Sequence, residues 1–513
     1  MNGKKMTKKN SSRLFVAGIL TAAICLAFSV AATSDTHYSI EIIEVNGGYG
    51  YQISHNNHIT IFQPFIPAIS GKKPFMEKED AKKVGKLVMR RMNCIQEYGI
   101  TPRILYLCNQ NKFNINVIRM KKSILIAALG LFSLSTMAQD AKPEEGFVFT
   151  TVKENPITSI KNQNRSSTCW SFSTLGFVES ELLRLGKGEY DLAEMFVVHK
   201  TMQDRGANYV RYHGDSSFSP GGSFYDVMYC IKNYGIVPQE VMPGIMYGDT
   251  LPVHNELDAV ASGYINAIAK GKLSKLTPVW KNGLAAIYDT YLGKCPENFT
   301  YKGKEYTPKT FAESLGLNPD DYVSLTSYTH HPFYSQFAIE IQDNWRNGLS
   351  YNLPIDEFMA VMDNAVKKGY TFAWGSDVSE QGFTRDGIAV MPNINKESEL
   401  SGSDMARWTG LTTANKRQIM TTKPHPEIDV TQEMRQVAFD NWETTDDHGM
   451  VIYGIAKDQN GKEYFMVKNS WGKSGKYNGI WYASKAFVAY KTMNILVHKD
   501  ALPKEIAKKL GIK

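Results

Sequence analysis

Cysteine is scarce in this chain, and the spacing of the few cysteines excludes several kinds of site. The 513 residues include six cysteines, and no two of them form a Cys-x-x-Cys pair. A zinc knuckle or a thioredoxin-type redox motif is therefore not expected. Only Cys169, Cys230 and Cys295 follow residue 138. A small, odd number of cysteines argues against a disulfide framework, even in an exported protein.

A strong excess of one charge is also absent. The formal net charge is +7, and the basic residues gather in short N-terminal runs rather than on one face. We therefore expect no nucleic-acid partner. With 43% hydrophobic and 21% charged residues, the composition is that of a globular protein with a sizeable core, and the length predicts more than one domain.

An uninterrupted apolar run of membrane-spanning length is missing as well. Residues 14–30 are apolar but contain Gly18, Thr21 and Ser29, follow a basic start, and precede Ala31-Ala32. We interpret residues 1–32 as a cleaved signal peptide, with a membrane anchor as the alternative, and expect no stable membrane span after cleavage.

A second segment of the same kind occurs much later. Residues 120–138 combine a basic start, a short apolar centre and a small-residue end, within a predicted linker at 112–138. Both segments predict export to the periplasm or the cell exterior. One hypothesis is that Met120 is the true or ancestral start of the protein and that residues 1–119 are a fused neighbouring gene or the result of an overlong gene assignment; N-terminal sequencing of the mature product would test it.

Between these segments, residues 33–111 are predicted to form a small α+β domain. Residues 38–45 alternate like a strand, Gly47-Gly48 forms a turn, residues 49–53 begin another strand, and residues 78–92 have helical spacing. With its segments 63–67 and 79–81, this part resembles a small domain of unknown function found in secreted bacterial proteins. This part contains no recognisable set of catalytic residues, and one hypothesis is that it is a small interaction module.

The predicted secondary structure of residues 139–513 changes from mainly helical to mainly β-strand along the chain. A strand is predicted at 147–152, a helix that starts with the segment 221–226 and continues to Tyr234, another helix at 359–366, and a buried strand at 370–375. Strands at 449–456 and 463–469 are joined by a turn at 458–461. Helices followed by strands indicate an α+β fold.

The most informative stretch is residues 163–172, in which polar residues lead to Cys169 and an apolar helical pattern begins at that cysteine. A thiol in the first turn of a helix is favoured as thiolate by the macrodipole and the unpaired N–H groups. Gln163 offers a side-chain amide where an oxyanion would form. Alone, Cys169 would be interpreted as a small buried residue.

A base and its orienter are expected from one hairpin far downstream. His448 heads one strand and Asn469 ends the next, so the two side chains can lie together, with Trp471 covering them. An Asn oxygen would orient the imidazole without adding charge and leave a thiolate–imidazolium pair with Cys169. Asp446 and Asp447 either tune His448 or are solvated, and a lone His or Asn is more often structural.

The ordered set of Gln163, Cys169, His448 and Asn469 resembles the papain superfamily of cysteine peptidases, over about residues 145–500. The resemblance implies a helical left domain, a β-barrel-like right domain and peptide substrates in the cleft between them. It also implies that Cys169 is the nucleophile, His448 the general base and acid, and Asn469 the orienter. Gln163 with the Cys169 backbone N–H would form the oxyanion hole.

The spacing narrows this resemblance to one branch. Cys169 and His448 are 279 positions apart, against about 130–150 in ordinary papain-like enzymes, which leaves room for a helical insertion at about 205–345. Segments 221–224, 234–238, 375–379 and 491–503 are similar to the bleomycin hydrolase / aminopeptidase C branch. That branch implies a homo-hexamer and a C-terminal carboxylate in the cleft. The basic tail at 501–513 departs from the usual ending, and a solvated surface helix is its alternative.

These observations predict thiol-dependent release of N-terminal residues from peptides by a domain at 139–513. An endopeptidase on the same scaffold and an inactive peptide-binding protein are the alternatives. No cofactor or metal is expected: His330-His331 lack the i, i+4 spacing and nearby carboxylates of a zinc site and are predicted to lie in a loop. Cys230 is predicted to be a core residue, and Cys295 has no assigned role.

Overall fold

The computed structural model describes residues 38–45, 47–55, 58–63, 74–98, 146–393 and 421–513, together with residues 412, 415 and 419. The chain divides into two units, Met1–Asp140 and Ala141–Lys513. Both predicted signal segments, residues 1–32 and the one within 112–138, lie outside the described residues, so the proposed boundaries stay predictions. Within the described ranges, no helix is both long enough and apolar enough to cross a membrane.

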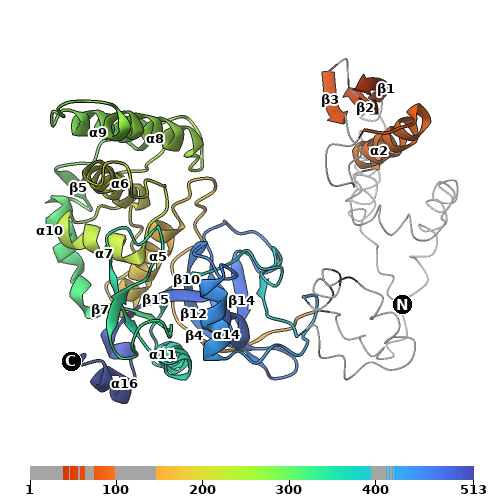
Figure 1. Ribbon diagram of the computed structural model, residues 1–513. Helices are drawn as coiled ribbons and strands as arrows, with labels where there is room; N and C mark the ends of the chain where they lie inside the picture. Colours follow the sequence, from red (N-terminus) through yellow and green to blue (C-terminus); the bar gives the residue numbers. More distant parts are fainter. Residues whose placement is uncertain are drawn as a thin grey trace, which may run out of the picture. The chain divides into compact units, whose positions relative to one another are not determined.

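The described residues of the N-terminal unit form a three-stranded antiparallel sheet and a helix (Figure 1). Its elements are β1 (Tyr38–Val45), β2 (Gly48–His55), β3 (His58–Gln63) and α2 (Lys78–Tyr98). Tyr51, Ile53, Phe75 and Ala81 form its small core. The two predicted strands and the predicted helix are confirmed, whereas β3 was not anticipated.

In the C-terminal unit, a series of helices precedes most of the sheet. They are α5 (Cys169–Arg184), α6 (Glu194–Arg211), α7 (Phe224–Asn233), α8 (Asn255–Lys270), α9 (Trp280–Leu292) and α10 (Pro308–Leu315), with the hairpin β5 (Phe299–Tyr301) and β6 (Lys304–Tyr306) and the 3-10 turn η1 (Pro319–Asp321). In Figure 1 these helices lie on one side of the unit and the blue C-terminal strands on the other.

A ten-stranded sheet forms the other half of the unit, in the order β11-β14-β13-β12-β10-β15-β7-β9-β8, with β4 paired to β12. The strands are β4 (Thr150–Glu154), β7 (Tyr322–Thr326), β8 (Gln336–Ala338), β9 (Leu349–Asn352), β10 (Phe372–Ser376), β11 (Ile388–Ala389), β12 (His448–Lys457), β13 (Glu463–Lys468), β14 (Ile480–Ser484) and β15 (Thr492–His498). The accompanying helices are α11 (Ile355–Lys367), α14 (Gln432–Asp440), α15 (Lys485–Lys491), η2 (Lys499–Ala501) and α16 (Lys504–Lys509). The predicted α+β class is confirmed.

Two expectations about this unit were incomplete. The strand expected at 147–152 begins at Thr150, because Phe147 and Phe149 instead pack on Tyr464. The interval 205–345, expected to be helical, also contains β7 and β8 of the large sheet. Strands of three to five residues carry too few alternations to be recognised by periodicity.

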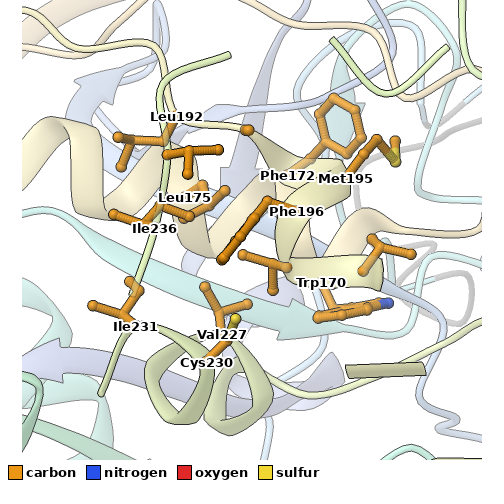
Figure 2. Packing of buried hydrophobic residues seen from close by; sticks show 14 of the residues in the cluster. Trp170, Phe172, Leu175, Leu192, Met195, Phe196, Val227, Cys230, Ile231 and Ile236 are labelled. Atoms are coloured by element: carbon orange, nitrogen blue, oxygen red, sulfur yellow. The ribbon is translucent and has the colours of Figure 1, made fainter. Parts of the chain in front are cut away.

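Helix α5 is the centre of the C-terminal unit, since every residue from Trp170 to Leu182 is buried. A helix buried on all faces is typical of the core of a large protein. Figure 2 shows Trp170 and Leu175 packed among Phe196 of α6 and Val227 of α7. This packing fixes the first turn of α5, and with it the position of Cys169.

Candidate active site

Cys169 is the first residue of α5, as predicted, with Thr168 as the N-cap. The Thr168 carbonyl accepts hydrogen bonds from the backbone N–H groups of Ser171 (2.9 Å) and Phe172 (3.2 Å). The loop before it is sharply turned, since Asn164 and Ser167 have φ of 46° and 55°. Cys169 is partly exposed and lines a pocket, while the residues after it are buried, so the rigid helix fixes its position there.

His448 and Asn469 lie together at the open end of the β12–β13 hairpin, as predicted. His448 begins β12, Asn469 directly follows β13, and His448 Nε2 lies 2.8 Å from Asn469 Oδ1. Both residues are buried, and Trp471 stacks on the imidazole with ring centroids 4.7 Å apart. With Nε2 bound to the amide, Nδ1 is the ring nitrogen left to exchange a proton with a thiol.

Gly449 lets this hairpin approach the thiol. A Cβ at Gly449 would lie 2.5 Å from Ser173 Oγ and 3.4 Å from the Cys169 carbonyl oxygen. Only a residue without a side chain allows β12 to run this close to the first turn of α5. The glycine after His448 therefore brings the base beside the helix that carries the thiol.

Gln163 is held by a residue that the sequence analysis did not identify. Its side-chain Oε1 accepts a hydrogen bond from Ser470 Oγ at 2.6 Å, and its backbone N–H donates to the Ser470 carbonyl at 2.8 Å. This hydrogen bond fixes the orientation of the Gln163 amide and leaves its Nε2 donors free of Ser470 Oγ. Ser470 also donates its backbone N–H to Asn469 Oδ1 at 2.7 Å, so one residue links the predicted orienter to the predicted oxyanion donor.

Of the predicted site residues, Cys169 and His448 line a pocket of about 680 Å³, whereas Gln163 and Asn469 lie behind its lining. Cys169 and residues 222–225 line it from the helical half, and Gly375 and residues 446–449 line it from the sheet. Its size is that of a typical ligand site. Within the described part of the chain, the lining ends at Leu496, so the C-terminal residues take no part in it.

Burial disfavours the thiolate form of Cys169 and the imidazolium form of His448 when either is charged alone. Burial raises the pKa of the Cys169 thiol, which hydrogen bonding to the Gly449 backbone only partly offsets. Burial also lowers the pKa of His448 to about 4, against the opposing effects of Asn469 and Asp447. The thiolate–imidazolium pair expected from the sequence is therefore favourable only when both charges form together, because each stabilises the other.

The two aspartates before His448 have different environments. Asp447 accepts hydrogen bonds from the backbone N–H groups of Val378 (3.1 Å) and Ser379 (3.0 Å) and from Thr445 Oγ1 (2.7 Å). Asp446 has no hydrogen bond or ion pair with any described residue, and it faces the pocket. The surrounding pocket wall, followed by the negative charges of Asp343 and Asp447, raises the pKa of Asp446, although the side chain itself remains exposed to solvent.

Three further expectations can be compared with the structure. Cys230 is a core residue, as predicted, and Cys295 is buried as well. His330 and His331 lie in the connection from β7 to β8, as expected of a loop. The expectation that they lack a nearby carboxylate is wrong, because Glu340 lies against both.

A thiol at the head of a central helix and an amide-held imidazole from a sheet, both lining one pocket, are the arrangement of a papain-like cysteine peptidase. The fold agrees with a solved structure, that of PepW from Lactobacillus rhamnosis HN001. The TM-score is 0.51 at 21% identity, covering 80% of this chain and 95% of PepW.

The chain belongs to the Peptidase C1-like family, whose profile matches residues 184–407 and 402–512. That match includes His448 and Asn469 and begins after Cys169, so the placement of Gln163 and Cys169 rests on the geometry above. Residues 41–104 match a domain of unknown function, DUF4907.

Curated relatives align over most of their own length. Aminopeptidase C of Streptococcus thermophilus is 24% identical over 418 residues, which is 72% of this chain and 86% of the relative. Aminopeptidase C of Listeria monocytogenes is 23% identical, over 68% of this chain and 81% of the relative. Aminopeptidase G of Lactobacillus delbrueckii is 23% identical, over 70% and 84%.

Proposed function

We propose that this protein is a thiol aminopeptidase that releases N-terminal residues from peptides through an acyl-enzyme on Cys169. The observation that carries the proposal is that Cys169 and His448 line one pocket, with Asn469 bound to His448 and Ser470 linking Asn469 to Gln163. The aminopeptidases among its relatives support the choice of substrate.

In the first half of the reaction, the Sγ proton passes to His448 Nδ1 and the thiolate attacks the scissile carbonyl carbon. The oxyanion accepts hydrogen bonds from the Cys169 backbone N–H and Gln163 Nε2. The imidazolium then donates its proton to the leaving amine as the C–N bond breaks. Asn469 holds the ring in the orientation that these transfers need.

In the second half, water attacks the thioester and gives a proton to His448. The bond from the carbonyl carbon to Sγ breaks, and the proton returns to the thiolate. The released product is the carboxylate of the N-terminal residue, and no metal or cofactor takes part in this scheme.

An aminopeptidase also needs a negative group that binds the α-ammonium of the substrate, and the described residues of the tail are not among those that line the pocket. Ile506 and Leu510 of the tail are buried in the sheet-side core, and Lys509 pairs with Glu357 at 2.6 Å. The tail is thus a packed surface helix, the alternative to a carboxylate in the cleft.

Asp446 is the carboxylate best suited to this role. It lies in the pocket wall two residues before His448, and it has no partner among the described residues, whereas Asp447 is fully engaged. Asp343, also in the wall, is already paired with Arg205 at 3.3 Å. We propose that an ammonium group binds Asp446, because a cation there relieves the mutual repulsion of neighbouring carboxylates.

The test compares aminoacyl and N-acetylated aminoacyl reporters on the wild type and on Asp446→Asn. We expect cleavage of the free-amine reporter by the wild type, with Asp446→Asn raising its KM about tenfold, the effect of about 1.4 kcal/mol. Asp320→Asn is the matched control, because Asp320 lines the same pocket but pairs with Lys232 at 2.6 Å.

The outcomes separate the two parts of the proposal. Equal cleavage of both reporters by the wild type would reject the aminopeptidase and favour an endopeptidase. A free-amine preference that survives Asp446→Asn would reject only the role of Asp446. Failure of an epoxide thiol-protease probe to label the protein would favour the inactive peptide-binding alternative.

We also propose that the protein is exported and that it assembles as a homo-hexamer. Export rests on the two signal-like segments, and mass spectrometry of the mature N-terminus in a cell fractionation would test it. A hexamer rests on the family resemblance, and light scattering of the purified protein would give its mass directly.

A further inference from the structure

We propose that the C-terminal unit carries a second site, which binds a divalent transition metal such as Zn²⁺. Its ligands are the Nε2 atoms of His330 and His331 and the carboxylate of Glu340, whose ligating atoms all lie within 4.8 Å of one another. The site lies outside the residues that line the pocket at Cys169.

The three side chains converge in the way a metal requires. Glu340 Oε2 lies 3.1 Å from His330 Nε2, and Glu340 Oε1 lies 2.7 Å from His331 Nε2. Two imidazoles and one carboxylate are a usual set of protein ligands for zinc, with water in the fourth position. Each side chain is between about a quarter and just over half exposed, so an ion can reach the site from solvent.

Both rings are held in place by neighbours that are not ligands. His331 stacks on Phe337 with centroids 4.2 Å apart, and His330 stacks on Phe439 at 5.5 Å with the rings 11° from parallel. Gln436 contacts His330 Nδ1 through both its oxygen (3.3 Å) and its nitrogen (3.0 Å). A partner on the second ring nitrogen is the usual support of a metal-binding histidine, because it fixes the tautomer and the ring orientation.

The carboxylate of Glu340 has no Lys or Arg partner among the described residues. These two histidines are its only ion-pair partners in the described part of the chain. Hydrogen bonds alone could also draw the three groups together, and metal binding distinguishes the two explanations.

A metal at this site would cross-link the segment on either side of β8, and the contact of Gln436 with His330 connects that segment to α14. His330, His331 and Glu340 belong to the segment around β8, whereas Gln436 belongs to α14. Helix α14 leads through residues 441–447 to His448. Binding to the folded state alone stabilises that state, so the metal acts on the stability of the unit and not on the chemistry at Cys169.

The experiment titrates the full-length protein with Zn²⁺ by calorimetry and by thermal unfolding. It uses a Cys169→Ala background, so that the catalytic thiol cannot act as a ligand. We expect one equivalent to bind and the Tm to rise. His331→Ala and Glu340→Gln should each abolish both effects, and Gln436→Met should weaken binding roughly ten- to a hundredfold.

The matched control is His213→Asn, which removes an exposed histidine elsewhere in the same unit and should leave binding unchanged. Circular dichroism checks that each variant folds. Absence of binding to the Cys169→Ala protein would overturn the proposal. So would binding of equal affinity in folded His331→Ala or folded Glu340→Gln.

Discussion

Gln163 shows how one hydrogen bond prepares a residue for catalysis. Ser470 holds the side-chain oxygen of Gln163 at 2.6 Å and so presents its nitrogen as a donor. We predict that Gln163→Ala lowers kcat by about 10²–10³ with little change in KM, because the lost donor acts on the oxyanion. Steady-state kinetics would measure this, and Ser470→Ala should cause a smaller loss of the same kind. A change confined to KM would contradict the assignment.

His254 makes the stability of the C-terminal unit dependent on pH. It is 1% exposed, its Nε2 is buried without a partner in the described structure, and burial lowers its pKa to about 4. The unfolded chain, with a histidine pKa near 6.5, then binds more protons than the folded chain between about pH 4 and 6.5. The stabilising contribution is therefore present above pH 6.5 and is lost as the pH falls towards 4.

We predict that the free energy of unfolding falls over this range, and that it falls less steeply in His254→Gln. Denaturant unfolding at several pH values would measure both slopes. Equal slopes in the two proteins would show that His254 is not responsible.

Among the elements, the contact between α5 and β12 decides whether the thiol and the imidazole meet. Gly449→Ala would place a methyl group 2.5 Å from Ser173 Oγ. We predict a loss of about 1–3 kcal/mol of stability, the usual cost of overpacking, together with a fall in kcat as His448 moves away from Cys169. Chemical denaturation and kinetics would measure the two effects.

Gly263→Ala is the matched control, because a Cβ there meets nothing within 4 Å. It should leave activity unchanged. Adding Ser173→Ala to Gly449→Ala removes the clashing oxygen and should restore part of both losses. No recovery in the double variant would place the cause elsewhere.

How much could be predicted differs from element to element. Helix α5 and the β12–β13 hairpin were predicted because their patterns are local and continuous. Ser470 and the approach of Glu340 to His331 could not be predicted, because they depend on how separate loops pack. Ser470 did carry a signal, since it lies between Asn469 and Trp471, but spacing alone does not show which atoms it contacts.

At the scale of the whole molecule, the C-terminal tail differs from what the family resemblance implies. Its helix packs on the sheet-side core, whereas the resemblance implies a carboxylate in the cleft. Deletion of residues 504–513 would uncover the surface beneath Ile506 and Leu510, whose burial contributes about 1.5–3 kcal/mol per side chain. We predict a lower Tm and an unchanged preference for free-amine over N-acetylated reporters. Loss of that preference would show that the tail, and not Asp446, selects the N-terminus.

The central claim is that Cys169 is the nucleophile, and covalent labelling tests it most directly. The protein is treated with an epoxide thiol-protease probe, digested, and analysed by mass spectrometry alongside Cys169→Ala. Cys230 and Cys295 provide internal comparison, because both are buried thiols. We predict a single adduct on Cys169, activity lost in proportion to labelling, and neither adduct nor turnover in Cys169→Ala. Turnover that persists in Cys169→Ala would contradict the account.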